Sequence, residues 1–475
     1  WVLNVSTGEA HRALTADLSV WSFEFSPDSK HLLFQATETP KTDDSYMSKK
    51  LYTVSLEGGD PQLLTDRKGK LGNATWSPDG KYIAFTGGVD IHDPTSGSVF
   101  VLSTKGGDPV NITKDFKGTA TWVGWKDKKT IVFAAIEGTE TTLNLVSLRG
   151  GKIRKILSGG PIFYSISFSK RWKIFAFSGS TYSHPPEVYT AAATGKAIKR
   201  LTNNNPGLNE VSLSRQEVVR WKSEDGTEIE GLLLKPLGYE EGKKYPLVVQ
   251  VHGGPESAYT NGWNTYYSRW TQLLASRGYA VLLPNYRGST GRGVEFAKAD
   301  QKDMGGKEFQ DILTGIDYLI ETGLVDPDRV GIGGGSYGGY MSAWAATAYS
   351  ERFAAAVVFA GISNWISKSG TSDIPYENAL VHWNMWWYEN PELVWDRSPL
   401  SHIKNSRTPT LIAHGERDAR VPVSQGWELY RGLKSMGVDV EFIIYPREPH
   451  GLREREHQID FINRVLEWYD RYLKQ

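Results

Sequence analysis

Residues 330–341 read Val-Gly-Ile-Gly-Gly-Gly-Ser-Tyr-Gly-Gly-Tyr-Met. An apolar strand runs into a glycine-dense turn, and a helical pattern follows. Gly334, Ser336 and Gly338 have the Gly-x-Ser-x-Gly spacing of a nucleophile elbow, in which small neighbours allow a strained turn to expose a serine hydroxyl. A plain glycine-rich turn is one alternative. A dinucleotide-binding loop is another, but it would require a Gly-x-Gly-x-x-Gly spacing and an acidic residue at the next strand end.

Two further residues follow Ser336 in the order that this kind of elbow requires, first an acid and then a histidine. Asp418 lies just past the apolar run Thr410 to Ala413, and His450 lies past the run Glu441 to Ile444. A serine hydroxyl is a poor nucleophile at neutral pH, so a histidine must accept its proton while a carboxylate orients the imidazole. We therefore expect Ser336, His450 and Asp418 to form a catalytic triad.

A triad of this type also needs backbone N–H donors for the negative charge that develops on the substrate. Tyr337, the residue after the nucleophile, supplies one donor. A second is expected from His252-Gly253-Gly254-Pro255, which directly follows the apolar run Leu247 to Val251.

The C-terminal half alternates apolar runs with helical patterns, which indicates a doubly wound, mostly parallel sheet. Further strands are expected at Ala280 to Leu283, Val330 to Ile332 and Ala355 to Phe359. Helices are expected at Asp311 to Glu321, Ser424 to Met436 and Ile459 to Leu473. Because active sites of open α/β sheets collect at the carboxyl ends of the strands, this organisation brings the triad together.

The N-terminal 200 residues repeat with a period of about 44 to 48 residues, which is typical of four-stranded β-propeller blades. One half of the repeat contains Ser-Pro-Asp-Gly-Lys or a close copy, as at Ser26 to Lys30 and Ser77 to Lys81. Pro and Gly suit a tight turn there, and no catalytic role is assigned to it. Four to five blades are visible. We expect a β-propeller over residues 1–205, N-terminally incomplete, and an α/β-hydrolase domain over residues 206–475.

The composition excludes several classes of function. Lys plus Arg equals Asp plus Glu, at 54 each, so no net charge attracts nucleic acid. Cysteine is absent, which excludes disulfides and a thiolate nucleophile. The histidines lack ligand spacing, so no metal or other cofactor is expected. No apolar run is long enough to span a membrane. The chain begins at Trp1 with no Met and no signal-like segment, so we expect that any targeting sequence has been removed or is not included. We expect a soluble protein and favour the periplasm or the exterior over the cytoplasm, with self-association left open.

Taken together, these motifs resemble the prolyl oligopeptidase family of serine peptidases along essentially the whole chain. The resemblance rests on the Ser336 elbow, on Asn285 to Gly291 (Asn-Tyr-Arg-Gly-Ser-Thr-Gly), on Val325 to Gly331 and on the Asp418 and His450 loops. The His-Gly-Gly-Pro sequence is similar to the acylaminoacyl-peptidase branch, and this similarity implies an oxyanion hole formed by Gly254 and Tyr337.

The same resemblance implies residues that contact the substrate. Ile362, Trp365 and Val421 align with the walls of the pocket for the residue before the scissile bond, and Arg420 aligns with a position that binds a substrate carbonyl. The N-terminal half shows no match to the paired glutamates with which dipeptidyl peptidases hold a free amino terminus.

The expected function is hydrolysis of short peptides through an acyl-enzyme, by release of dipeptides or acylated residues, with an apolar residue before the cut. An esterase with the same triad, and an oligopeptidase that cleaves internally, are the alternatives.

Overall fold

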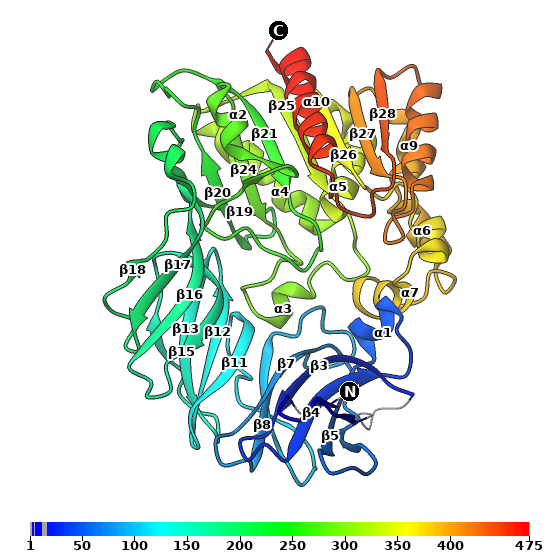
Figure 1. Cartoon of the computed structure of the whole chain (residues 1–475). Coiled ribbons are helices and arrows are strands. Elements are labelled where there is room, and N and C mark those ends of the chain that lie inside the picture. The colour runs from blue at the N-terminus through cyan, green and yellow to red at the C-terminus, as the bar shows by residue number, and fades with distance from the viewer. Residues whose placement is uncertain (1, 4, 12–16, 475) are drawn as a thin grey trace.

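The computed structural model describes residues 2–3, 5–11 and 17–474. Sheets of antiparallel strands form the lower part of the molecule, and a larger mixed sheet covered by helices forms the upper part (Figure 1). The C-terminal helix lies at the top, far from the N-terminal sheets. Among the described residues, no helix is both long enough and apolar enough to cross a membrane.

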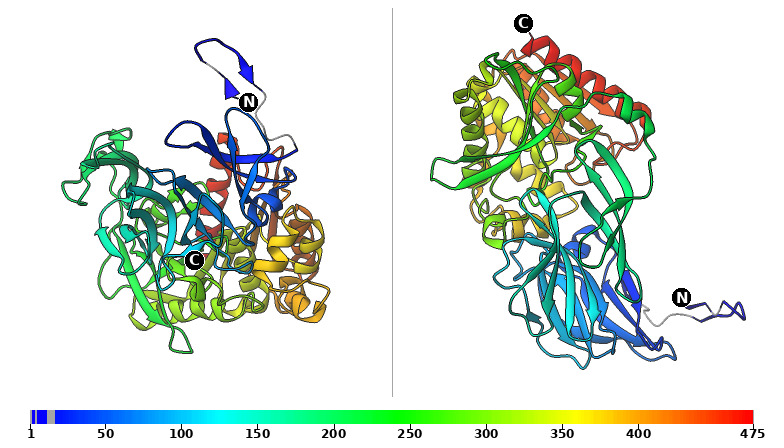
Figure 2. Two further views of the ribbon diagram at one scale, coloured as in Figure 1. Left: turned by 90° about the horizontal axis from the view of Figure 1, so that it is seen from below. Right: turned by 90° about the vertical axis from the view of Figure 1, so that its left-hand side faces the viewer.

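The N-terminal part consists of consecutive four-stranded antiparallel sheets, the unit from which propeller blades are built. Figure 2 shows these sheets side by side in chain order. Their strands are β3 (Ser19–Phe25), β4 (His31–Thr37), β5 (Lys50–Ser55) and β6 (Gln62–Thr65); β7 (Leu71–Trp76), β8 (Tyr82–Gly87), β9 (Ser98–Ser103) and β10 (Val110–Asn111); β11 (Thr119–Asp127), β12 (Thr130–Glu137), β13 (Glu140–Ser147) and β14 (Arg154–Leu157); and β15 (Ile162–Phe168), β16 (Ile174–Thr181), β17 (His184–Ala192) and β18 (Lys199–Arg200). A separate ribbon pairs β1 (Val2–Leu3) with β2 (Ala10–His11).

The Ser-Pro-Asp elements form the tight turns expected of them. The Gly80 N–H donates to the Ser77 carbonyl at 2.9 Å, and the Ser77 hydroxyl donates to Asp79 at 2.8 Å. Each element joins the first two strands of a sheet, which explains why it recurs with the repeat.

The C-terminal part is organised around an eight-stranded sheet in the order β19-β20-β24-β21-β25-β26-β27-β28. All pairs from β24 to β28 are parallel, as predicted, whereas β19 and β20 are antiparallel and were not predicted. The strands are β19 (Gln216–Lys222), β20 (Glu228–Leu234), β21 (Tyr245–Val251), β24 (Ala280–Asn285), β25 (Val325–Gly335), β26 (Ala355–Phe359), β27 (Thr410–Gly415) and β28 (Val440–Tyr445), with a small ribbon of β22 (Thr265–Tyr266) and β23 (Arg269–Trp270) beside them.

Helices cover both faces of this sheet, so its central strands are buried throughout. Side chains of α4 and α5 pack on one face together with α9, and those of α2 and α10 pack on the other. The helices are α2 (Thr271–Ser276), α3 (Val294–Ala297), α4 (Lys307–Glu321), α5 (Tyr337–Ala348), α6 (Trp365–Thr371), α7 (Pro375–Glu377), α8 (Pro391–Asp396), α9 (Ser424–Ser435) and α10 (Arg455–Leu473), with α1 (Thr42–Met47) inserted in the first N-terminal sheet. Helix α1 contacts α7, so the two parts meet there.

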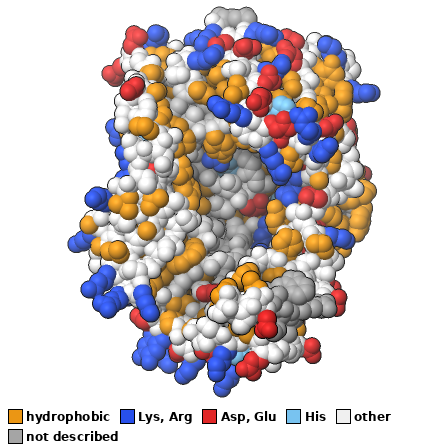
Figure 3. Space-filling model, viewed as in Figure 1, with side chains coloured by type: hydrophobic (Ala, Val, Ile, Leu, Met, Phe, Trp, Pro, Cys, Tyr) orange, Lys and Arg blue, Asp and Glu red, His pale blue; other side chains and the backbone are white. Residues whose placement is uncertain are grey.

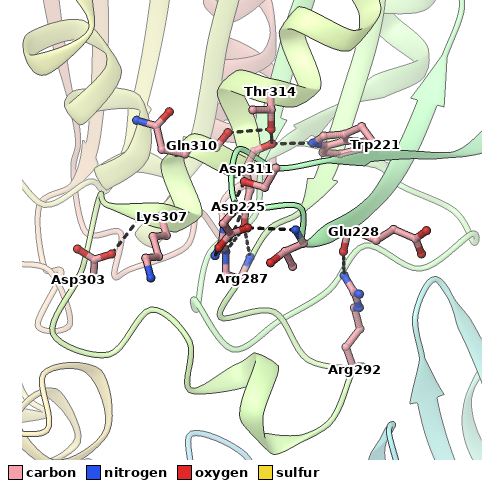
Figure 4. Close-up of polar contacts among 12 residues, drawn as sticks. Trp221, Asp225, Glu228, Arg287, Arg292, Asp303, Lys307, Gln310, Asp311 and Thr314 are labelled. Atoms are coloured by element: carbon pink, nitrogen blue, oxygen red, sulfur yellow. Dashed lines mark hydrogen bonds and ion pairs between the residues drawn. The ribbon is translucent and has the colours of Figure 1, made fainter.

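A buried ion pair ties the loop after β24 to the sheet and to helix α4 (Figure 4). The Arg287 guanidinium donates to both oxygens of Asp311, with a closest distance of 2.6 Å, and also bonds Asp225 and Ser223 near the β19–β20 turn. Asp311 is fully buried. Burial alone would lower the pKa of Arg287, but its two carboxylate partners raise it.

We expect Arg287→Met to destabilise the fold by about 3–5 kcal/mol, because it leaves the Asp311 carboxylate buried without its partner. Chemical denaturation measures the loss. Arg292→Met is the matched control: this nearby arginine donates to the Glu228 carbonyl (Figure 4), and its loss should cost less than about 1 kcal/mol. Equal effects of the two variants would contradict the role given to Arg287.

Candidate active site

Ser336 lies in the sharp turn between β25 and α5, in a backbone conformation that residues other than glycine rarely adopt. Its φ is 59° and its ψ is −119°. The Ser336 N–H donates to the Phe359 carbonyl of the adjacent strand at 2.9 Å, which holds the turn against β26. A strained serine at the carboxyl end of a central strand is the geometry of a nucleophile elbow.

The glycines on either side of Ser336 are required by close approach to β21. A Cβ atom on Gly334 would lie 2.3 Å from the Val251 carbonyl oxygen, and one on Gly338 would lie 2.2 Å from the same atom. Neither distance is compatible with a side chain. The turn can therefore be this tight only with glycine at both positions.

The Asp418 carboxylate holds the His450 imidazole. His450 Nδ1 lies 2.8 Å from Asp418 Oδ2, while Asp418 Oδ1 accepts the backbone N–H groups of Arg420 and Val421 at 2.9 and 3.0 Å. His414, which is fully buried, also lies 3.4 Å from Asp418. Burial raises the pKa of Asp418, but the hydrogen bonds of His414 and His450 outweigh it and hold that pKa below its ordinary value. An ionised Asp418 keeps the His450 proton on Nδ1 and leaves Nε2 available as a base.

The His252 loop lies against the nucleophile turn. A Cβ atom on Gly253 would approach the Ser336 Cβ to 3.2 Å, and Gly254 lines the same cavity as Ser336. Burial lowers the pKa of His252 to about 3, so its ring is neutral. One ring nitrogen lies 2.9 Å from the Gly253 carbonyl and the other lies 2.9 Å from the Ser289 hydroxyl.

Tyr286 packs against this loop and holds it in place. The sequence did not point to this role. Its ring stacks on His252 with centroids 4.4 Å apart, and its hydroxyl donates to the His252 carbonyl at 2.8 Å. Tyr286 and Ser289 both belong to the Asn-Tyr-Arg-Gly-Ser-Thr-Gly motif, so that motif fixes the loop from which the second oxyanion donor was predicted.

Tyr337, the other predicted donor, begins helix α5 with its side chain buried beneath the site. Its hydroxyl donates to Glu308 Oε1 at 2.9 Å. Burial raises the pKa of Glu308 to about 8. The anchored side chain fixes the backbone of the residue whose N–H must face the substrate.

A cavity of about 450 Å³ opens over Ser336 and His450, between the N-terminal sheets and the eight-stranded sheet. Figure 3 shows a deep recess between the two parts of the molecule. The specificity residues predicted from the sequence line this cavity, namely Ile362, Trp365, Arg420 and Val421. The Arg420 side chain bonds Asp373 at 2.7 Å and lies over the Tyr46 ring at 5.2 Å, so its guanidinium is held at the cavity wall.

Ionisable residues that the sequence did not single out complete the cavity wall. They are Lys70, Glu256, Lys368, Glu377 and His382. Lys70 comes from the N-terminal part, immediately before β7, and its ammonium bonds the Glu377 carboxylate from helix α7. No local motif marks these positions, because they meet only when the two parts of the chain come together.

We expect Asp418→Asn to slow the reaction of Ser336 with a fluorophosphonate by about a thousandfold or more, because an amide no longer stabilises the charged, correctly oriented imidazole. Mass spectrometry of the labelled protein against time measures the rate. Asp328→Asn, a change at an exposed position, is the matched control and should label at the unchanged rate. Rapid labelling of Asp418→Asn would exclude this carboxylate from the triad.

Comparisons with known proteins agree with this geometry. The sequence pattern of the prolyl oligopeptidase family matches residues 265–475. An uncharacterized peptidase, YuxL, of Bacillus subtilis (strain 168) is 38% identical over 316 residues, which cover 65% of this chain and 47% of the relative. Dipeptidyl-peptidase 5 of Porphyromonas gingivalis is 28% identical over 492 residues, which cover 99% of this chain and 70% of that protein.

The acylaminoacyl peptidase of Pyrococcus horikoshii is similar in structure. The comparison gives a TM-score of 0.81 at 26% identity, and it covers 100% of this chain and 74% of that protein. The chain thus spans about half the length of YuxL and about three quarters of the archaeal peptidase. The residues that match the family pattern include Ser336, Asp418 and His450, so the C-terminal part of the chain is similar to the prolyl oligopeptidase family.

Proposed function

We propose that the protein is a serine exopeptidase that releases dipeptides or acylated residues from short peptides through an acyl-enzyme intermediate. The observation that carries the proposal is the hydrogen bond between His450 and Asp418 at the edge of a cavity that also contains Ser336. Similarity to a dipeptidyl peptidase and to an acylaminoacyl peptidase supports the proposed substrate class.

In the proposed mechanism the Ser336 hydroxyl attacks the scissile carbonyl while His450 Nε2 accepts its proton. The backbone N–H groups of Tyr337 and Gly254 stabilise the oxyanion that forms. His450 then donates the proton to the departing amine, which leaves Ser336 acylated. A water molecule, deprotonated by the same nitrogen, releases the acid and restores the serine.

The N-terminal sheets are proposed to act as propeller blades that restrict the size of the substrate. The domain boundary near residue 205 remains a prediction. Contacts from these sheets, such as Lys70 with Glu377, place them over the catalytic cavity. Short peptides fit into a cavity of this size, whereas a folded protein does not.

The pocket for the residue before the scissile bond is proposed to prefer compact apolar side chains, because Ile362, Trp365 and Val421 present apolar walls. Such walls discriminate by about 1–3 kcal/mol per methylene, so the preference should be graded.

The proposal is tested with a peptide library in free and amino-terminally acetylated forms, with the products identified by mass spectrometry. We expect cleavage near the amino terminus, and Ser336→Ala should lose about a million-fold in turnover. Internal cleavage would contradict the exopeptidase assignment. Turnover of a short-chain ester without any turnover of peptide anilides would indicate an esterase instead.

We further expect Arg420→Ala to lower kcat/KM on peptides by about ten- to a hundredfold, because its guanidinium is proposed to bind a substrate carbonyl through a charge-assisted hydrogen bond. A small ester that lacks this carbonyl should be hardly affected. Arg417→Ala changes an exposed arginine of the same loop and serves as the matched control. Equal losses on peptide and ester would mean that Arg420 only supports the Asp418 loop.

A further inference from the structure

Among the described residues, the ionisable side chains around the cavity are paired, with one exception. Lys70 bonds Glu377, and Arg420 bonds Asp373 at 2.7 Å. His382 Nε2 lies 3.1 Å from Glu256. Lys368 is different, because within the described part of the chain no carboxylate lies within ion-pair distance of its ammonium.

Lys368 is nevertheless deeply buried. Only 2% of the residue is exposed, and it lines the same cavity as Ser336. Its ammonium lies 5.3 Å from the centre of the Trp365 ring, three residues earlier on helix α6, and donates a hydrogen bond to the Asn378 side-chain oxygen. An ammonium group can donate three hydrogen bonds, and one neutral acceptor does not compensate a buried charge.

The surroundings of Lys368 also contain a buried donor without an acceptor. The Asn378 side-chain oxygen already faces Lys368 and His382 Nδ1, while the amide nitrogen of the same buried side chain has no hydrogen-bond partner among the residues described. Buried donors without acceptors are costly, and a ligand that carries oxygen acceptors would satisfy them.

The position of Lys368 identifies which part of a substrate it meets. Trp365 is one of the proposed walls of the pocket for the residue before the scissile bond, and residues three apart on a helix lie on the same face. A small apolar side chain contacts only Trp365 and its apolar neighbours. A side chain long enough to pass these walls would bring its end group to the ammonium.

We propose that Lys368 binds the carboxylate of an acidic substrate side chain, glutamate or aspartate, immediately before the scissile bond. This inference rests on the proposed peptidase function and extends it. The pocket then has apolar walls and a cationic end, so it accepts small apolar and acidic side chains and rejects lysine and arginine.

The charge of Lys368 is expected to depend on pH in the working range. Burial lowers its pKa to about 7; nearby Arg420 also lowers it, whereas Glu377, Asp373 and Glu256 act in the opposite direction. A lysine is charged below its pKa, so the preference for glutamate over glutamine is largest near pH 6 and declines as the pH rises above 7.

The test compares Ala-Glu and Ala-Gln p-nitroanilides, in free and acetylated forms, by the ratio of their kcat/KM values at pH 6 and pH 8.5. The wild-type protein should favour glutamate by about tenfold at pH 6, because the bond to the ammonium is charge-assisted. Lys368→Met should bring the ratio to about one, Lys368→Arg should retain a preference, and Lys434→Met, at an exposed position, should leave the ratio unchanged. A wild-type ratio of about one, or an undiminished ratio in Lys368→Met, would overturn the proposal.

A binding experiment separates this inference from the peptidase assignment. Ser336→Ala is titrated calorimetrically with acetyl-Ala-Glu-amide and acetyl-Ala-Gln-amide, which requires no turnover. Tighter binding of the glutamate ligand at pH 6 but not at pH 8.5 supports the role of Lys368 even if the wild-type protein hydrolyses neither anilide. Equal binding of both ligands at pH 6 refutes it even if the anilides are cleaved. Neither result depends on whether a Lys368 variant folds.

Discussion

The active site depends on how closely the turn at Ser336 approaches the neighbouring strand. Glycines on both sides of the serine lie against the Val251 carbonyl, where any side chain would overlap it. The serine itself has a φ of 59°, which is unfavourable for a residue with a side chain. Strain of this kind persists only where the surrounding structure fixes the backbone, and the parallel strands on either side supply that constraint. The exposure of the hydroxyl is therefore a property of main-chain packing.

The loops that meet Ser336 are held in place by side chains that pack against them. The site therefore has its geometry before a substrate binds. Tyr286 and Ser289 fix His252 by a stacked ring and hydrogen bonds, and Arg287 ties the same loop to Asp311 of helix α4. On the other side, Asp418 is fixed by backbone N–H groups as well as by two histidines. Donors and charges held in this way need not reorganise during reaction, which is the main electrostatic advantage of an enzyme over water.

Much of this arrangement could be predicted from sequence, because it is encoded locally. Apolar runs marked the parallel strands, which are covered on both faces, and the elbow, acid and histidine stood in the expected order. Strand β19 was missed because it is an edge strand on which exposed and buried residues alternate, unlike the continuous apolar runs of the central strands. Lys70 and Glu377 could not be paired in advance, since 307 residues separate them and nothing near either one marks the contact.

That ion pair also shows that both parts of the molecule contribute to the wall of the cavity. Burial lowers the pKa of Lys70, but its attraction to Glu377 and Glu256 more than reverses the effect, so the ammonium stays charged within the cavity wall. A buried pair of this kind contributes little net stability, because desolvation offsets the attraction, but removing either partner leaves an uncompensated charge. Its main effect is on geometry. The pair fixes the start of β7 against helix α7, and the same wall contains Lys368, whose ammonium has no carboxylate partner among the described residues. Glu377 of helix α7 thus pairs the lysine that the N-terminal part supplies, and Lys368 of helix α6 is left available for the proposed acidic side chain.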